Sequence, residues 1–281
     1  MADYASQADN TQTGNESVLL RDDRDGVATL TLNRPDKFNA LSTELMGAVQ
    51  NQLDAIADDR SVKVVVIAAN GRAFCAGHDL QEMKAMDGRE PLESLFKQCS
   101  RMMTTLTRIP QPVIAQVHGV ATAAGCQLVA QCDLAVAAAD VRFATSGINL
   151  GLFCSTPMVA VTRNLPRKQA LEMLYTGDFI DAETAQQYGL VNRVVAPDRL
   201  DRATEDLART IAGQSPRAIQ FGKELFYKQI EEGLDAAYAL ATETIVENML
   251  HPDAQGGVGA FLEKKPMPDW QDPTKDTEDQ S

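Results

Sequence analysis

Apolar and polar positions alternate, or run unbroken, in four segments of the first half of the chain. After an Asp25-Gly26 turn, residues 27–32 alternate in the manner of a strand. Residues 62–69 form an almost unbroken β-branched run, as expected of a strand buried on both faces. Two shorter apolar segments, 113–117 and 134–138, predict two more strands.

Helical spacing of apolar residues dominates the rest of the chain. Ser42 is placed to cap a helix in which Leu45, Val49, Leu53 and Ile56 share one face. A helix over 92–108 is ended by the prolines that follow it, and a short one is expected over 123–132. Beyond residue 158 the pattern is nearly all helical, with helices predicted at 168–175, 182–188, 200–212, 217–232, 234–249 and 257–264.

This order of elements predicts four regions. Residues 1–16 contain three acidic residues but no Lys or Arg, so they resemble neither a secretory signal nor an Arg-rich transit peptide, and we expect a disordered leader. An α/β core over 17–200 and a helical region over 201–265 follow. The acidic tail, 266–281, is expected to be disordered.

Charge and cysteine content narrow the classes of partner. With 26 Lys and Arg against 39 Asp and Glu, the formal net charge is -13, which argues against binding to nucleic acid or to an anionic membrane. No apolar run approaches the roughly 20 residues that span a bilayer. The five cysteines are odd in number and lack the spacing of a metal site, so we expect reduced thiols, no metal and a cytoplasmic protein.

Three motifs occur together in the first half of the chain: Leu-Asn-Arg-Pro-Asp-Lys-Phe-Asn-Ala-Leu at 32–41, Phe-Cys-Ala-Gly-His-Asp-Leu at 74–80, and His-Gly-Val-Ala-Thr-Ala-Ala-Gly-Cys at 118–126. Their order and spacing resemble the crotonase (enoyl-CoA hydratase/isomerase) superfamily. The similarity extends over about residues 20–265. Residues 123–130 and 151–157 resemble most the subgroup of enoyl-CoA hydratase domain-containing protein three. No GxGxxG or GxxxxGK[ST] motif follows a predicted strand, so a Rossmann or P-loop fold is unsupported.

The resemblance implies a fold, a ligand and an assembly. The fold is an α/β crotonase (ClpP-like) spiral of ββα units over the core, with a helical C-terminal section. The ligand is an acyl-CoA thioester of lipid metabolism, in which coenzyme A is part of the substrate and no separate cofactor is needed. A homotrimer, or a hexamer of two trimers, is expected.

Chemistry at a thioester builds negative charge on the carbonyl oxygen, which two backbone N–H groups can stabilise. By resemblance these donors are the amides of His78 and Ala124, the second at a helix N-terminus whose dipole adds to the effect. Gly77 and Gly125 alone would be ordinary turn glycines. Found together in this order, they favour an oxyanion hole.

The resemblance also implies how coenzyme A is held. Lys37 and Phe38 are expected along the nucleotide end, and Ala76, His78, Asp79 and Leu80 along the pantetheine channel. Asp79 has a simpler interpretation as a loop-capping residue. Phe261 and Lys264 are expected to close the phosphate site, from this subunit or a neighbouring one. For Lys264, a favourable position at a helix C-terminus is an equally good explanation.

The chain departs from the hydratases of the family at the two catalytic glutamates. Gln127 and Gly147 stand in those positions, and neither can take a proton from water. Cys154 aligns with a substrate-adjacent residue of a decarboxylase branch, although a buried core thiol is the simpler role.

The sequence therefore leaves several functions open. The first hypothesis is an acyl-CoA lyase that uses His78 and Ala124 with Gln127, Cys154 or a bound water, and that catalyses weak hydration or decarboxylation. The second is a non-catalytic protein that carries or senses CoA esters. A structural protein without a ligand is the third.

Overall fold

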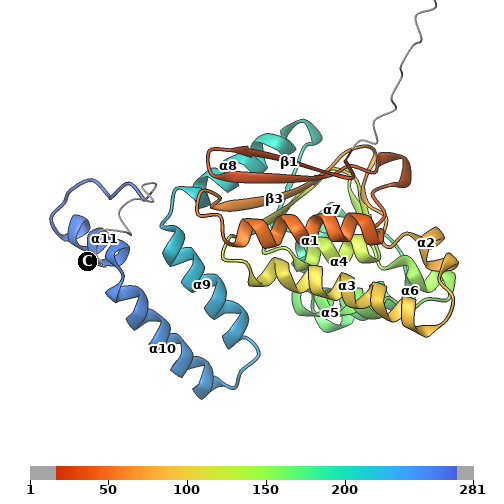
Figure 1. Ribbon diagram of the computed structural model, residues 1–281. Coiled ribbons are helices and arrows are strands. Elements are labelled where there is room, and N and C mark those ends of the chain that lie inside the picture. Colours follow the sequence, from red (N-terminus) through yellow and green to blue (C-terminus); the bar gives the residue numbers. More distant parts are fainter. Residues whose placement is uncertain (1–16, 271–281) are drawn as a thin grey trace, which may run out of the picture.

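The computed structural model describes residues 17–270 and contains two β-sheets surrounded by helices (Figure 1). The predicted leader, and residues 271–281 of the predicted tail, lie outside the described residues. The larger sheet has the strand order β1-β2-β3-β5-β7-β10. Its strands are β1 (Leu19–Arg24), β2 (Val27–Leu32), β3 (Val64–Ala69), β5 (Val113–Val117), β7 (Leu134–Ala138) and β10 (Arg193–Val195). All neighbours are parallel except β1 and β2.

The second sheet is made of very short strands, of which β4, β6 and β8 each follow a strand of the first sheet. Its order is β4-β6-β8-β9, with bounds Ala73–Cys75, Val120–Thr122, Arg142–Ala144 and Ile180–Asp181. The first three are parallel, and β9 closes the edge in the antiparallel direction. The chain thus alternates between the two sheets, in the manner of a spiral of ββα units.

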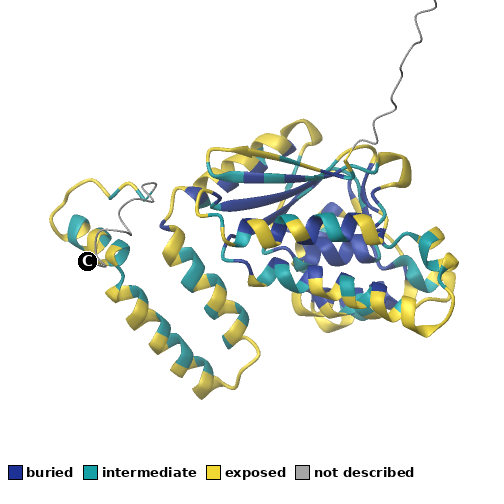
Figure 2. Cartoon of the chain, viewed as in Figure 1, coloured by how far each residue is buried: buried dark blue, intermediate teal, exposed yellow. Residues whose placement is uncertain are grey.

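Eight helices surround the sheets. They are α1 (Thr43–Ala57), α2 (Leu80–Ala85), α3 (Arg89–Arg108), α4 (Ala124–Gln131), α5 (Ser155–Asn164), α6 (Arg167–Thr176), α7 (Ala182–Tyr188) and α8 (Leu200–Ala212). Short 3-10 turns occur at η1 (Pro35–Lys37), η2 (Ser146–Leu150) and η3 (Pro197–Arg199). Helix α4 is almost wholly buried, which makes it the centre of the core (Figure 2). None of the helices within residues 17–270 is both long and apolar enough to cross a membrane.

The longer predicted elements are confirmed. The strands at 27–32, 113–117 and 134–138 and the helices at 182–188 and 200–212 have the predicted bounds. Ser42 accepts a hydrogen bond from Leu45 N at 3.2 Å, as expected of a helix N-cap. The short strands β4, β6, β8 and β9 were not predicted, because two or three residues are too few to show an alternating pattern.

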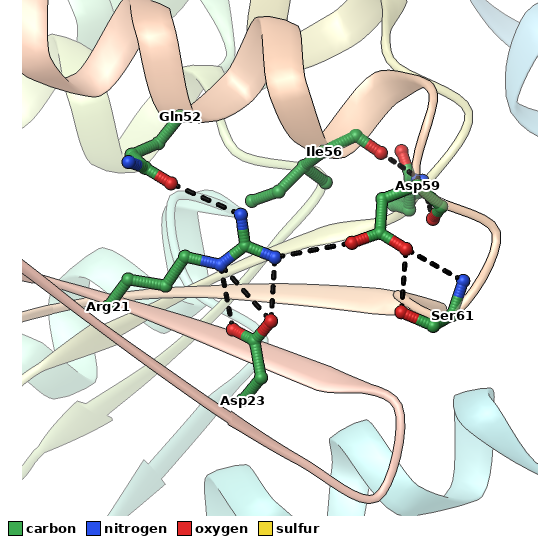
Figure 3. Close-up of polar contacts among 7 residues, drawn as sticks. Arg21, Asp23, Gln52, Ile56, Asp59 and Ser61 are labelled. Atoms are coloured by element: carbon green, nitrogen blue, oxygen red, sulfur yellow. Dashed lines mark hydrogen bonds and ion pairs between the residues drawn. The ribbon is translucent and has the colours of Figure 1, made fainter.

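The edge strand β1 is held to the adjacent helix by Arg21 (Figure 3). Its guanidinium pairs with Asp23 on the same strand at 2.6 Å and donates to Gln52 of α1 at 3.2 Å. It also reaches Asp59, just after α1, at 3.4 Å. Hydrogen bonds from Ser61 hold the pKa of the Asp59 carboxyl below its usual value. This polar cluster fixes strand β1 against α1 on the surface.

The three C-terminal helices form an arm that stands away from the core. The arm consists of α9 (Pro216–Gln229), α10 (Leu234–Leu250) and α11 (Pro252–Leu262), and none of its helices has a buried residue (Figure 2). Helix α8, by contrast, packs on the core sheet with Leu200, Thr204, Ala208 and Ala212 buried. The part of the chain without a core of its own therefore begins at α9.

A buried ion pair fixes the arm to the core. Lys223 of α9 bonds Asp133 at 2.7 Å and the main-chain oxygens of Leu106 and Gln111 at 2.8 Å. Tyr227, one turn further on, donates to the other oxygen of Asp133 at 2.7 Å. Because Asp133 comes two residues after the end of α4, the arm is anchored beside the central helix of the core.

Helix α4 approaches strand β4 so closely that only glycine fits at position 125. A Cβ on Gly125 would lie 2.0 Å from the main-chain oxygen of Cys75. We predict that Gly125→Ala lowers the free energy of unfolding by about 3 kcal/mol or more, because backbone must move to admit the methyl group. Thermal or denaturant unfolding measures this loss.

Gly222→Ala is the matched control for this prediction. A Cβ on Gly222, in exposed helix α9, meets nothing within 4 Å. The control should therefore be neutral or stabilise by about 0.5–1 kcal/mol through helix propensity. Equal stabilities for the two variants would show that the close approach of α4 to β4 does not exist.

Candidate functional site

The loop after β4 leaves the His78 amide free to bind a ligand. Leu41 N–H donates to Gly77 O at 2.7 Å, and Asp79 N–H donates to Leu41 O at 3.1 Å, which together form a parallel bridge. In extended backbone, successive N–H groups point to opposite sides. The bridge uses the N–H of Asp79, so the N–H of His78 points away from Leu41.

The N-terminus of α4 lies directly beside this loop. No side chain caps the helix, and Ala123 before it takes the left-handed φ of 51°. Gly77 has φ +96°, and a Cβ there would lie 3.4 Å from Ala124 N. The loop that carries the His78 amide therefore packs on the helix turn that carries the Ala124 amide. The structure brings together the two residues predicted to form the oxyanion hole.

His78 is half-buried, and its imidazole is neutral. Burial lowers its pKa to about 4, and its ring meets the edge of Phe96 with centroids 5.2 Å apart. Among residues 17–270, His78 Nε2 is one of five buried side-chain polar atoms without a hydrogen-bond partner. The side chain therefore adds a neutral polar group next to the amide, not a positive charge.

Gln127 is also buried, with 4% of its surface exposed. Its Oε1 is another of the unpartnered polar atoms in the described part of the chain. Residues three apart on a helix lie on neighbouring positions of one face, so Gln127 is one turn from Ala124. A neutral amide stands where the resemblance expects a glutamate.

Gly147 lies directly against the thiol of Cys154. A Cβ on Gly147 would lie 2.9 Å from Cys154 Sγ and 2.6 Å from Leu152 O. Burial raises the pKa of the Cys154 thiol, so it stays protonated at neutral pH. The thiol thus fills space that any side chain at position 147 would need. The sequence did not indicate this contact, because the two residues lie on different elements, η2 and the N-cap of α5.

The residues expected to hold coenzyme A lie at the η1 turn, for the nucleotide end, and between β4 and the start of α2, for the pantetheine channel. Phe38 is 41% exposed, and Lys37 Nζ is 3.4 Å from Gln81 Oε1. Ala76 and Leu80 are also exposed. The sequence interpretation missed Arg72, whose guanidinium lies over the Phe38 ring at 4.7 Å. Its place four residues before Ala76, at the other end of β4, was the available signal.

Asp79 is a capping residue, in agreement with the simpler interpretation. Its carboxylate accepts from the amides of Gln81 and Glu82 at the start of α2 and pairs with Arg34 at 3.0 Å. Burial alone would raise its pKa, but these hydrogen bonds outweigh burial and hold the pKa below its usual value. The pair fixes the loop after β4 to the start of η1.

Within one chain, Phe261 and Lys264 do not lie beside the other candidate site residues. They lie at the end of the arm, which Figure 1 shows at the opposite end of the molecule from α2. Phe261 is 71% exposed. If these residues serve the site at all, they serve that of another subunit.

The five thiols are all buried and unpaired. No group of three or more His, Cys, Asp or Glu side chains in residues 17–270 is arranged to hold a metal ion. The uncharged side chains among the candidate site residues are thus the His78 imidazole, the Gln127 amide and the Cys154 thiol.

Comparisons with known proteins show the family to which the chain belongs. A sequence model of the family described as enoyl-CoA hydratase/isomerase matches residues 22–273. The human protein "Enoyl-CoA hydratase domain-containing protein 3, mitochondrial" is 45% identical over 246 residues, which cover 88% of this chain and 81% of that protein. "2,3-Dehydroadipyl-CoA hydratase" of Escherichia coli is 35% identical over 89% of this chain and 96% of its own length.

A solved structure of enoyl-CoA hydratase from Mycobacterium smegmatis superposes with a TM-score of 0.89 at 55% identity, and covers 90% of this chain and 99% of its own.

The expected cytoplasmic location is wrong on this comparison, because the vertebrate relatives are named mitochondrial. Unpaired thiols indicate only a reducing environment, and this does not single out the cytoplasm. The predicted α/β crotonase fold is confirmed, and the chain belongs to the enoyl-CoA hydratase/isomerase family, in the subgroup that resembles enoyl-CoA hydratase domain-containing protein 3.

Proposed function

We propose that this protein binds an acyl-CoA thioester and holds its carbonyl oxygen with the amides of His78 and Ala124. The observation that carries the proposal is the free His78 N–H beside the uncapped N-terminus of α4. Preorganised N–H donors in a buried site stabilise charge on such an oxygen far better than water does. The helix dipole favours the same charge, and α4 is central and rigid.

Hydration by a pair of carboxylates is not part of this proposal. Gln127 cannot accept a proton from water, and Gly147 has no side chain. Cys154 Sγ and Leu152 O lie 2.9 Å and 2.6 Å from the position that a Cβ on Gly147 would take, so a carboxylate side chain at position 147 would require its neighbours to move. The reaction, if one occurs, must need little beyond polarisation of the thioester.

Decarboxylation of a malonyl-type thioester is the second candidate, and Cys154 favours it. In that reaction the bond to the carboxylate breaks, carbon dioxide leaves, and the electron pair passes to the thioester as an enolate. The enolate then takes a proton. The Cys154 thiol, which burial keeps protonated, is a suitable donor next to Gly147.

Coenzyme A would lie along the exposed residues after β4. Its phosphates are anionic, and the protein carries an excess of acidic residues, so the cations that bind them must be local. Lys37 and Arg72 flank the exposed Phe38 ring and supply positive charge at that end. Ala76, Asp79 and Leu80 belong to the channel wall in this proposal.

The arm supports a trimer or hexamer as the functional assembly. It exposes a series of large apolar side chains: Phe226, Ile230, Leu234, Tyr238, Ile245, Val246, Met249, Leu250, Val258, Phe261 and Leu262. Apolar surface on this scale marks an interface. Phe261 and Lys264 would then meet the nucleotide end of a neighbouring subunit.

A ligand pair tests the oxyanion hole without any mutation. Butyryl-CoA has the thioester oxygen, whereas S-butyl-CoA, a thioether, lacks it. We predict that butyryl-CoA binds at least about tenfold more tightly, since two hydrogen bonds of about 1 kcal/mol each are lost in the thioether. Calorimetric titration measures both. Equal affinities for the two ligands would show that the protein does not hydrogen-bond the carbonyl oxygen.

Mass spectrometry of incubated thioesters tests the chemistry. The mass of crotonyl-CoA should not change on incubation with the protein, because the carboxylate pair is missing. A Gln127→Ala variant should likewise leave crotonyl-CoA unchanged. Gain of one water by crotonyl-CoA would contradict this prediction. Loss of carbon dioxide from a malonyl-type thioester would establish decarboxylase activity. If no carbon dioxide is lost, decarboxylation is excluded and thioester binding is the function that is left.

Light scattering tests the assembly. We expect a mass three or six times that of the 30.5 kDa chain at micromolar concentration. The apolar side chains of the arm then lie in subunit contacts. A monomer under these conditions would contradict the proposed trimer and leave Phe261 and Lys264 without a role in the site.

A further inference from the structure

Ala123, the residue before helix α4, adopts a backbone conformation that favours glycine. Its φ is 51° and its ψ is -118°, which are the angles of the first central residue of a type II′ turn. Glycine dominates at that position because a Cβ there meets the main chain. Such conformations persist only where the surrounding structure imposes them, and they cluster at functional sites. The methyl group of Ala123 is therefore kept at a cost.

Hydrogen bonds on both sides of Ala123 impose this conformation. Its N–H donates to Ala144 O of β8 at 2.9 Å, and its carbonyl oxygen accepts from Gln127 N at 3.0 Å. Strand β6 ends at Thr122 and α4 begins at Ala124, so one residue makes the whole turn from sheet to helix. Glycine at position 123 would follow the same path without strain. The strain comes from the methyl group alone, so the contacts of this group show what it does.

The methyl group of Ala123 lies against the loop that carries His78. A Cβ on Gly77 would lie 3.0 Å from Ala123 Cβ. It would also lie 3.3 Å from Thr122 O and 3.4 Å from Ala124 N. Of these three neighbouring atoms, only the Cβ of Ala123 belongs to a side chain. Gly77 therefore lies in a hollow formed by the main chain at the start of α4 and by this methyl group.

The same loop is also held by Leu41. Leu41 N–H donates to Gly77 O at 2.7 Å, and Asp79 N–H donates to Leu41 O at 3.1 Å. These hydrogen bonds fix the loop to Leu41, while the methyl group of Ala123 limits how closely the loop approaches α4. His78 lies between Gly77 and Asp79 in the chain, so both contacts position its N–H.

We propose that Ala123 is a positioning residue whose methyl group sets the spacing between the His78 amide and the Ala124 amide. This inference rests on the proposed oxyanion hole, in which both amides donate to one carbonyl oxygen. Hydrogen bonds weaken as their distance and angle leave the optimum, so two donors on separate elements need a fixed spacing. Without the methyl group, the loop can move towards α4, and the turn before the helix gains conformational freedom.

Calorimetric titration of the full-length Ala123→Gly variant with butyryl-CoA and S-butyl-CoA tests this role. Butyryl-CoA should bind about fivefold more weakly than to the wild type, which is the equivalent of one hydrogen bond. The affinity for S-butyl-CoA, which lacks the carbonyl oxygen, should not change. A preference for butyryl-CoA as large as that of the wild type would overturn the proposal, and so would an equal loss of affinity for both ligands.

The melting temperature of Ala123→Gly should change in the opposite sense to its affinity for butyryl-CoA. It should equal or exceed that of the wild type at the same protein concentration, because the relief of strain offsets the greater freedom of glycine in the unfolded chain. A residue with only a structural role would lose stability and binding together. A lower melting temperature would show that the methyl group is not kept under strain, and the proposal would fail.

Two further variants separate the Cβ of residue 123 from other effects of the change. Asp25→Gly also replaces a residue of positive φ, 50°, in the exposed turn between β1 and β2, and it should keep the wild-type preference. Ala123→Ser keeps a Cβ and should keep the preference as well. If either of these variants loses as much of the preference as Ala123→Gly does, the Cβ is not the spacer.

The wild-type protein separates this inference from the proposed function. If the wild type binds butyryl-CoA no more tightly than S-butyl-CoA, the oxyanion hole is absent and the role of Ala123 fails with it. If the wild type prefers butyryl-CoA and Ala123→Gly keeps the full preference, the oxyanion hole stands and only the role of Ala123 is lost.

Discussion

The close packing of the β4 loop on the first turn of α4 is the constraint on which the site depends. Gly125 lets the helix meet the main chain of Cys75. Gly77 lets the loop pass close to the helix, since a Cβ added at Gly77 would lie only 3.4 Å from Ala124 N. The bridge to Leu41 then determines that the His78 amide points away from Leu41. Two backbone donors from segments far apart in the sequence are brought together in this way, and no side chain is needed to make them.

Three of the candidate site side chains, those of His78, Gln127 and Cys154, are uncharged. The His78 imidazole is uncharged because burial lowers its pKa to about 4. The Cys154 thiol keeps its proton because burial raises its pKa. With Gln127 as an amide, the groups near the donors can polarise, orient or donate, but they offer no strong base. Such a site suits the binding of a thioester, or a reaction that needs only stabilisation of an enolate.

The sequence predicted the larger elements well because their periodicity extends over many residues. It predicted Ser42 as a helix cap and α4 almost to the residue. The short strands β4, β6 and β8 were missed, yet they position the loops that carry His78 and Ser146. Tertiary contacts were also beyond reach: the stacking of Arg72 on Phe38, the pair of Arg34 with Asp79, and the contact of Cys154 with Gly147 join residues that no local pattern connects. The resemblance supplied the candidate site residues, and only the structure shows which of them meet within one chain.

Isotope-edited infrared spectroscopy of a bound acyl-CoA, labelled with ¹³C at the thioester carbonyl, tests the central claim most directly. Hydrogen bonds from His78 and Ala124 and the dipole of α4 would polarise the carbonyl more strongly than water does. We predict that its stretching frequency falls on binding, to a value below that in water. A frequency equal to or above the value in water would show that the carbonyl oxygen is not held by these amides.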